Sequence, residues 1–115
     1  MSERSILKKT YEAFNNRDID AVLSKMHKDV DWPNGWEGGR VYGHVGVRDY
    51  WTRQWKVLNP RVEPLSFEVD PTGRVIVDVH AVIRDLDGQV VADHSVRHAY
   101  RFENGLIRSM DIIKV

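Results

Sequence analysis

Apolar residues recur every three or four positions through the first half of the chain, which is typical of helices that pack one face on a core. Residues 3–16 carry one such pattern, and Asp18 is placed to cap a short second helix that follows it. A third pattern covers residues 43–58 and stops before Pro60. The N-terminal half therefore predicts three helices.

The segment between the second and third helices has a different character. Residues 29–33 read as a short strand closed by Pro33. A glycine-rich stretch follows over residues 34–43 and includes Trp36 and Tyr42. We expect this stretch to be a loop.

From Arg61 onward, apolar and polar residues alternate, which is typical of strands with one buried face. Asp70-Pro71-Thr72-Gly73 suits a type I turn with a glycine bulge, and Asp87-Gly88 and Asn104-Gly105 each suit a two-residue hairpin. The alternation and these turns predict four strands, over residues 61–69, 74–86, 89–103 and 106–114.

The turns also predict which residues face each other across the strands, because pairing continues from a hairpin with a constant register unless a bulge intervenes. Phe67 is expected beside Val77, and Val77 opposite His98. On the other face Asp78 should pair with Arg97. The last hairpin places His98 opposite Asp111 on the same face.

Sorting the strand residues by parity separates two faces of the sheet. One is apolar along all four strands, apart from His94, His98, Ser109 and Asp111, and must meet the helices. The expected architecture is one α+β domain over residues 1–115, a cone-shaped α+β roll in which N-terminal helices pack on a strongly curved antiparallel β-sheet. The roll should close over one small apolar pocket.

Composition narrows the classes of function. The chain has 115 residues, of which 42% are apolar, and Lys+Arg and Asp+Glu are both 17, so no basic field favours nucleic acid. Cysteine is absent, which excludes thiolate chemistry and disulfides. No apolar run approaches the roughly 20 residues of a membrane span, and the N-terminus lacks the apolar run of a signal peptide. We expect a cytoplasmic protein with no nucleic-acid or membrane partner.

Three stretches resemble the nuclear-transport-factor-2-like superfamily, and more closely its SnoaL-like polyketide-cyclase and ketosteroid-isomerase-like branch. They are YEAFNNRD (11–18), GHVGVRDYW (43–51) and HAYRFENGLI (98–107). The resemblance implies helices followed by a long curled antiparallel sheet, which agrees with the pattern above. The superfamily includes both enzymes and binding modules, so the resemblance implies no single activity.

The resemblance implies catalytic roles for only some residues of this sequence. In SnoaL-type cyclases an aspartate on the last strand is the acid/base and a histidine lies on the strand before it, which implies Asp111 and His98. In ketosteroid isomerases a first-helix tyrosine and a later aspartate are required. Thr10 and Asn34 stand at those positions here, with Tyr11 one place off. The Asp-Arg-Asp set of limonene-epoxide-hydrolase relatives is not expected, because Asp78 and Arg97 lie on the opposite face from Asp111.

The predicted His98–Asp111 pair has three readings. A carboxylate held by an imidazole in a dry pocket can move a proton beside a carbonyl. The pair could equally orient a ligand, or join the last two strands as a satisfied buried pair. No metal or other cofactor is expected, because His94 and His98 are four strand residues apart, roughly 13 Å, too far to share one ion.

The sequence thus predicts small-molecule binding, with a small apolar or polyketide-like ligand and isomerase-, cyclase- or hydrolase-type acid/base chemistry by Asp111 and His98. The alternative is a non-catalytic ligand-binding or protein-interaction module of the same fold. A homodimer is expected through the outer sheet face, where Ile76, Val82, Ala99, Met110 and Ile112 alternate with charged residues. The expected pocket walls and oxygen-binding groups are Trp32, Trp36, Tyr50, Trp55, Phe67, Val77, Tyr100 and Ser109.

Overall fold

The computed structural model describes residues 2–114 and contains the three predicted helices. Helix α1 (Glu3–Asn15) begins at Ser2, whose hydroxyl accepts a hydrogen bond from the Ser5 amide. Helix α2 (Ile19–Leu23) begins at Asp18, which accepts from the Ala21 amide as an N-cap does. Helix α3 (Gly43–Gln54) ends four residues earlier than predicted, because strand pairing resumes at Leu58.

One six-stranded sheet, in the order β2-β1-β6-β5-β4-β3, forms the second layer. Its strands are β1 (Met26–Pro33), β2 (Arg40–Tyr42), β3 (Leu58–Val69), β4 (Val75–Asp85), β5 (Val90–Glu103) and β6 (Leu106–Lys114). The prediction of a purely antiparallel sheet is wrong in one place, since β1 pairs parallel to β6. Strand β2, which pairs with β1, lies in the stretch predicted as loop.

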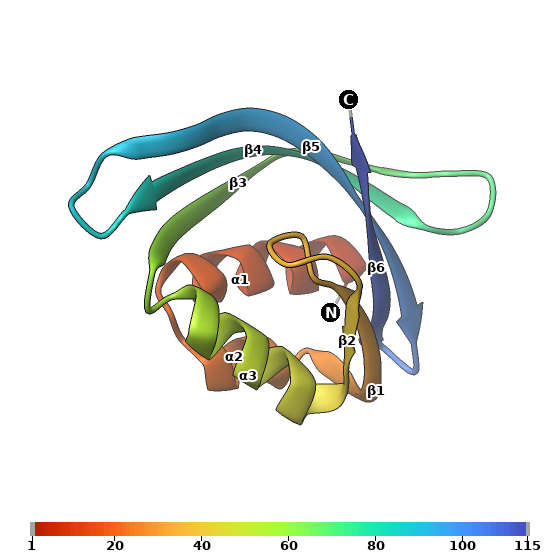
Figure 1. The fold of residues 1–115 in the computed structure, drawn as a ribbon. Helices are drawn as coiled ribbons and strands as arrows, with labels where there is room; N and C mark the ends of the chain where they lie inside the picture. Colours follow the sequence, from red (N-terminus) through yellow and green to blue (C-terminus); the bar gives the residue numbers. More distant parts are fainter. Residues whose placement is uncertain (1, 115) are drawn as a thin grey trace.

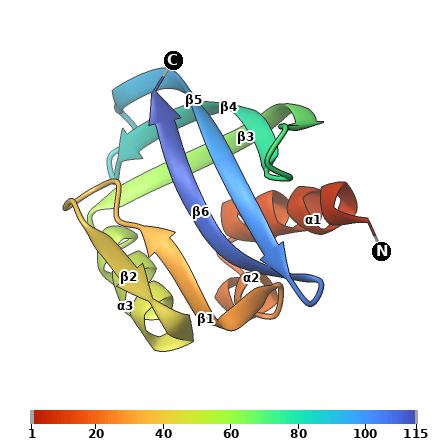
Figure 2. The same cartoon turned by 90° about the vertical axis from the view of Figure 1, so that its right-hand side faces the viewer.

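The sheet curves strongly around the helices, which lie against its concave side (Figures 1 and 2). Side chains from both layers meet in the core, and the most deeply buried belong to α1, α2, β1, α3, β4 and β6. They include Leu7, Val30, Val47, Val77, Val79 and Ile107, each 0% exposed. The architecture is therefore the predicted α+β roll, left open at its two edge strands.

The turn between β3 and β4 has the predicted register. Phe67 pairs with Val77, and Gly73 adopts the positive φ of 89° that a glycine bulge requires. A further bulge leaves Leu65 without a partner between Pro64 and Ser66. This turns Leu65 away from the apolar face, and it is 62% exposed.

The hairpin between β4 and β5 has the predicted strand pairing but not the predicted turn. Its turn has three residues rather than two, because the Asp85 amide donates to the Gln89 carbonyl at 2.9 Å. An irregularity at Val91 then restores the register. As predicted, His98 lies opposite Val77, and Asp78 lies opposite Arg97.

The last hairpin begins as predicted and then departs from it. Asn104 and Gly105 have φ values of 53° and 79°, as a type I′ turn requires. An extra residue, Arg108, then lies between the pairs Phe102–Ile107 and Arg101–Ser109. The bulge shifts β6 by one position, and a one-residue shift turns each following side chain to the other face.

The predicted His98–Asp111 cross-strand pair is therefore wrong. His98 faces Ile112, and Asp111 faces Ala99. Met110, predicted on the outer face, is 3% exposed and lies on the concave side with Ile112. Asp111 takes the convex side instead.

The edge strand β3 is joined to α1 by one side chain. The Asn15 carboxamide donates to the Val62 carbonyl at 2.7 Å and accepts from the Val62 amide at 2.9 Å. These two bonds satisfy backbone groups on the free edge of the sheet and fix where α1 lies beneath it.

We predict that Asn15→Leu lowers the free energy of unfolding by about 2 kcal/mol, since it removes two hydrogen bonds of about 1 kcal/mol each. Urea denaturation followed by circular dichroism measures the change. Asn16→Leu is the matched control, because Asn16 is exposed and its side chain makes no hydrogen bond within residues 2–114. Equal losses in the two variants would contradict the role assigned to Asn15.

Candidate functional site

A cavity of about 780 Å³ opens between the concave face of the sheet and helices α1 and α3. This volume lies within the range that holds a drug-sized molecule. Most of its surface is apolar and much of it is aromatic. The aromatic side chains that line it are Tyr11, Phe14, Trp32, Trp36, Tyr50, Trp51 and Tyr100.

The aromatic wall is held together by edge-to-face packing. Trp51, from α3, lies 5.6 Å from Trp32 and 5.2 Å from Phe14, with steep interplanar angles in both pairs. Such arrangements place the positive edge of one ring on the negative face of the next. These contacts fix the rings relative to one another, and Phe14, Trp32 and Trp51 all line the cavity.

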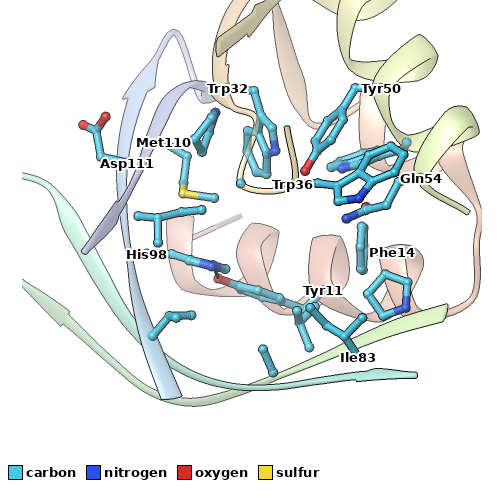
Figure 3. A pocket seen from close by; sticks show the side chains of 18 of the residues that line it. Tyr11, Phe14, Trp32, Trp36, Tyr50, Gln54, Ile83, His98, Met110 and Asp111 are labelled. Atoms are coloured by element: carbon cyan, nitrogen blue, oxygen red, sulfur yellow. Dashed lines mark hydrogen bonds between the residues drawn. The ribbon is translucent and has the colours of Figure 1, made fainter. Parts of the chain in front are cut away.

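A chain of buried polar groups crosses the concave face. The Tyr100 hydroxyl donates to the Tyr11 hydroxyl at 2.8 Å. The Tyr11 hydroxyl lies 2.7 Å from His98 Nδ1, and Figure 3 shows these two side chains meeting. Tyr100 and Tyr11 are 1% and 4% exposed. Burial raises the pKa of both tyrosines, so both remain hydroxyl donors at neutral pH.

The direction of this chain sets the protonation of His98. If Tyr11 donated to Tyr100, the buried Tyr100 proton would have no acceptor within residues 2–114. With Tyr100 donating to Tyr11, the Tyr11 proton goes to Nδ1, and the proton of the neutral imidazole lies on Nε2. Nε2 has no partner among the described residues and is not sealed in the core, so it faces the cavity.

Burial also keeps this imidazole neutral. Desolvation lowers the pKa of His98 to about 4, and no carboxylate of residues 2–114 lies against the ring to offset it. At neutral pH the cavity therefore contains an uncharged Nε2–H donor, oriented by Tyr11.

Asp111 does not take part in this chain. Its carboxylate binds Arg40 Nη1 at 3.0 Å, and its side chain is 52% exposed. Arg40 also pairs with Asp31 and donates to the Met110 carbonyl at 2.6 Å. This cluster joins β2, β1 and β6 at the rim of the cavity, and Figure 3 shows Asp111 turned away from His98.

Of the eight residues predicted to form the pocket walls or bind ligand oxygens, four line the cavity and four do not. Trp32, Trp36, Tyr50 and Tyr100 line the cavity, together with His98. Trp55, Phe67, Val77 and Ser109 do not. Trp55 packs on Phe14 and Trp51. Phe67 lies under the Arg4 guanidinium, and Val77 is buried in the core. The β6 bulge turns Ser109 to the convex side of the sheet.

Tyr11 and Gln54 are cavity residues to which the sequence assigned no role. Both occupy helix positions whose spacing matches the apolar face, Tyr11 beside Leu7 and Phe14, and Gln54 beside Tyr50. A polar group on an apolar helix face was the available signal.

Two classes of feature are missing from residues 2–114. This part of the chain has no group of three His, Asp or Glu side chains arranged to hold a metal ion. None of its helices is long and apolar enough to cross a membrane.

The buried imidazole predicts a specific pH dependence of stability. Its folded pKa of about 4 lies below the unfolded value of 6.5, so the unfolded chain takes up a proton first as the pH falls. Stability should decrease by about 3 kcal/mol between pH 6.5 and 4 on this account alone. The His98→Asn variant has no imidazole at this position. Between pH 6.5 and 4 its unfolding free energy should therefore decrease by about 3 kcal/mol less than that of the wild type. Parallel curves for the two proteins in urea titrations across this range would contradict it.

The comparisons with known proteins agree with the fold. Residues 7–110 match the sequence profile described as the SnoaL-like domain. No curated protein matches the chain. Among solved structures, TerC, crystallised with polyporic acid, is 29% identical with a TM-score of 0.82, over 96% of this chain and 89% of TerC.

Two further solved structures show the same fold. An NTF2-like protein of unknown function from Burkholderia pseudomallei is 25% identical with a TM-score of 0.84, over 100% of this chain and 92% of that protein. SalBIII, an epoxide hydrolase/cyclase-like enzyme of pyran ring formation in salinomycin, is 17% identical with a TM-score of 0.79, over 96% and 88%. Because the profile spans nearly the whole chain, this protein belongs to the SnoaL-like family of the nuclear-transport-factor-2-like superfamily.

Proposed function

We propose that this protein binds a small, flat, oxygen-bearing apolar molecule in its cavity, with His98 Nε2–H donating to one of the ligand's oxygens. The observation that carries the proposal is the Tyr100–Tyr11–His98 chain, which orients a neutral donor toward the cavity. Trp32, Trp36, Tyr50 and Trp51 supply flat apolar walls. TerC, which was crystallised with polyporic acid, supports a ligand of this kind.

The same donor supports proton-transfer chemistry of the isomerase or cyclase type. When a proton leaves the carbon beside a carbonyl, negative charge develops on the carbonyl oxygen. A fixed N–H in a site shielded from water stabilises that charge without having to reorient. His98 would serve as the oxyanion donor, and Tyr11 would position it.

Binding without turnover is the second candidate. Asp111, at the rim of the cavity, is the single carboxylate that the described residues bring to it, and it is paired with Arg40. Residues 2–114 therefore present no free carboxylate base to the ligand. A ligand-binding or protein-interaction module would need the walls and the donor but not a base.

The first test uses 1-tetralone, which carries one carbonyl on a two-ring apolar skeleton. We predict that His98→Phe weakens its binding about tenfold, as expected from one lost hydrogen bond of about 1.4 kcal/mol. Calorimetric titration measures this, and naphthalene, which has no oxygen, should bind both proteins alike. His80→Phe, on the convex face, is the matched control. Equal 1-tetralone affinity in wild type and His98→Phe would refute the donor role.

The same complex separates the two candidates. Hydrogens beside the 1-tetralone carbonyl exchange with deuterium oxide only if a proton is removed. Exchange above the buffer rate, followed by NMR and lost in His98→Phe, favours proton-transfer chemistry. Exchange at the buffer rate in a protein that binds 1-tetralone favours binding without turnover.

We also propose that the protein forms a homodimer through the convex face of its sheet. The proposed cytoplasmic location rests on the sequence alone. Met110 and Ile112 leave the set of apolar residues first assigned to that face, because the β6 bulge turns them inward. Ala99 leaves it too, since it is already buried at 1% exposed. Ile76 and Val82 remain, beside the Asp78–Arg97 and His80–Asp93 pairs. Apolar groups among charged pairs are what a standard interface presents.

Sedimentation at micromolar concentration should give about twice 13.4 kDa, and Ile76→Lys should shift the protein toward that monomer mass. The reason is that a lysine at the centre of a dimer interface would lose its hydration on association. A wild-type mass of 13.4 kDa would exclude the dimer.

A further inference from the structure

Gln54 is a buried polar side chain without a hydrogen-bond partner in the described part of the chain. It lies at the C-terminal end of α3, is 8% exposed and lines the cavity. Its carboxamide makes no hydrogen bond within residues 2–114, yet its atoms are not sealed in the core. The amide therefore faces the cavity, where a bound molecule or water must satisfy it.

Gln54 and His98 lie on different walls. Gln54 comes from the helical layer and His98 from strand β5, and Figure 3 shows them on opposite sides of the view, with Gln54 beside Trp36 and Tyr50. A ligand that meets both must carry polar atoms at two separate edges. A molecule with one oxygen can satisfy only one of them.

Other polar groups of the lining also have no hydrogen-bond partner among the described residues. They include the indole N–H groups of Trp32, Trp36 and Trp51, three residues that line the cavity. With His98 Nε2–H and the Gln54 amide hydrogens, they form a lining richer in donors than in acceptors. Each buried donor left unpaired costs about 1–3 kcal/mol, so a ligand that presents several acceptors is favoured.

We propose that the ligand is a flat ring compound with acceptor oxygens on two separate edges, of the quinone or polycarbonyl class, held by His98 at one edge and by Gln54 at the other. This inference rests on the proposed function and adds the second anchor. Gln54 sets specificity here: it selects a dioxygenated ring over a mono-oxygenated ring of the same size.

The test compares 1,4-naphthoquinone with 1-tetralone, two probes that share a fused two-ring skeleton and differ in having two carbonyls or one. The chain has no cysteine that the quinone could alkylate. The measured quantity is the ratio of the two dissociation constants, obtained by calorimetric titration. Comparing this ratio between variants cancels differences in probe hydrophobicity.

Gln54→Leu should decrease the preference for the quinone about tenfold while leaving 1-tetralone affinity within about twofold. Gln89→Leu is the matched control, since Gln89 is exposed in the β4–β5 turn and should keep the wild-type ratio. Gln54→Met, unbranched and of similar length, repeats the test if the leucine variant does not fold by circular dichroism.

The outcomes separate this inference from the proposed function. A ratio unchanged in both Gln54 variants would overturn the Gln54 anchor and leave His98 binding intact. Failure of the wild-type protein to bind either probe would count against the proposed function itself. A ratio that decreases equally in Gln89→Leu would also overturn the inference, because the effect would then not come from the cavity.

Discussion

The concave face of the sheet has to cover two helices and enclose a cavity at once, and a strand can curve that far only where its regular pairing is interrupted. Bulges at Leu65, Val91 and Arg108 provide these interruptions. Each adds one residue to one strand, so each also exchanges the faces of the side chains beyond it. The bend of the sheet and the composition of the cavity are thus set by the same few residues.

The bulge at Arg108 has the largest chemical effect. It brings Met110 and Ile112 to the cavity and moves Asp111 out to Arg40. An acidic pair with His98 would have favoured a charged imidazole. Without a carboxylate beside it, His98 is held by tyrosine hydroxyls and remains neutral. A neutral ring donates a hydrogen bond to an uncharged oxygen without an accompanying ion, which suits an apolar ligand.

This arrangement has a cost in stability. Burying an imidazole, two phenol hydroxyls and a carboxamide on largely apolar walls removes them from water. Within residues 2–114, only the hydroxyls and one ring nitrogen have hydrogen-bond partners. A fold selected for stability alone would place apolar groups at His98 and Gln54. Unsatisfied polar atoms inside a preformed cavity are instead typical of sites whose partner is a ligand.

Much of the fold could be predicted from local pattern. Helical periodicity located α1 and α3, the cap at Asp18 located α2, and the turn residues at Gly73 and Asn104-Gly105 located two hairpins. These signals are local, because capping and positive φ depend on residues a few positions apart. The pairings of Val77 with His98 and of Asp78 with Arg97 followed from them, since the irregularity at Val91 compensated for the longer turn.

What the sequence determined by itself is the class of fold, the order of its elements apart from β2, and the presence of His98 on a buried face. The tertiary structure alone decided the partners of His98. The Arg108 bulge forms where β6 meets β1, with Arg108 donating to the Asp29 carbonyl and the Ile107 amide to the Lys25 carbonyl. Those contacts join residues about eighty positions apart, and no local pattern records them. Because one extra residue reverses a strand's faces, this long-range pairing moved Asp111 away from the imidazole, whose partner is Tyr11 of α1.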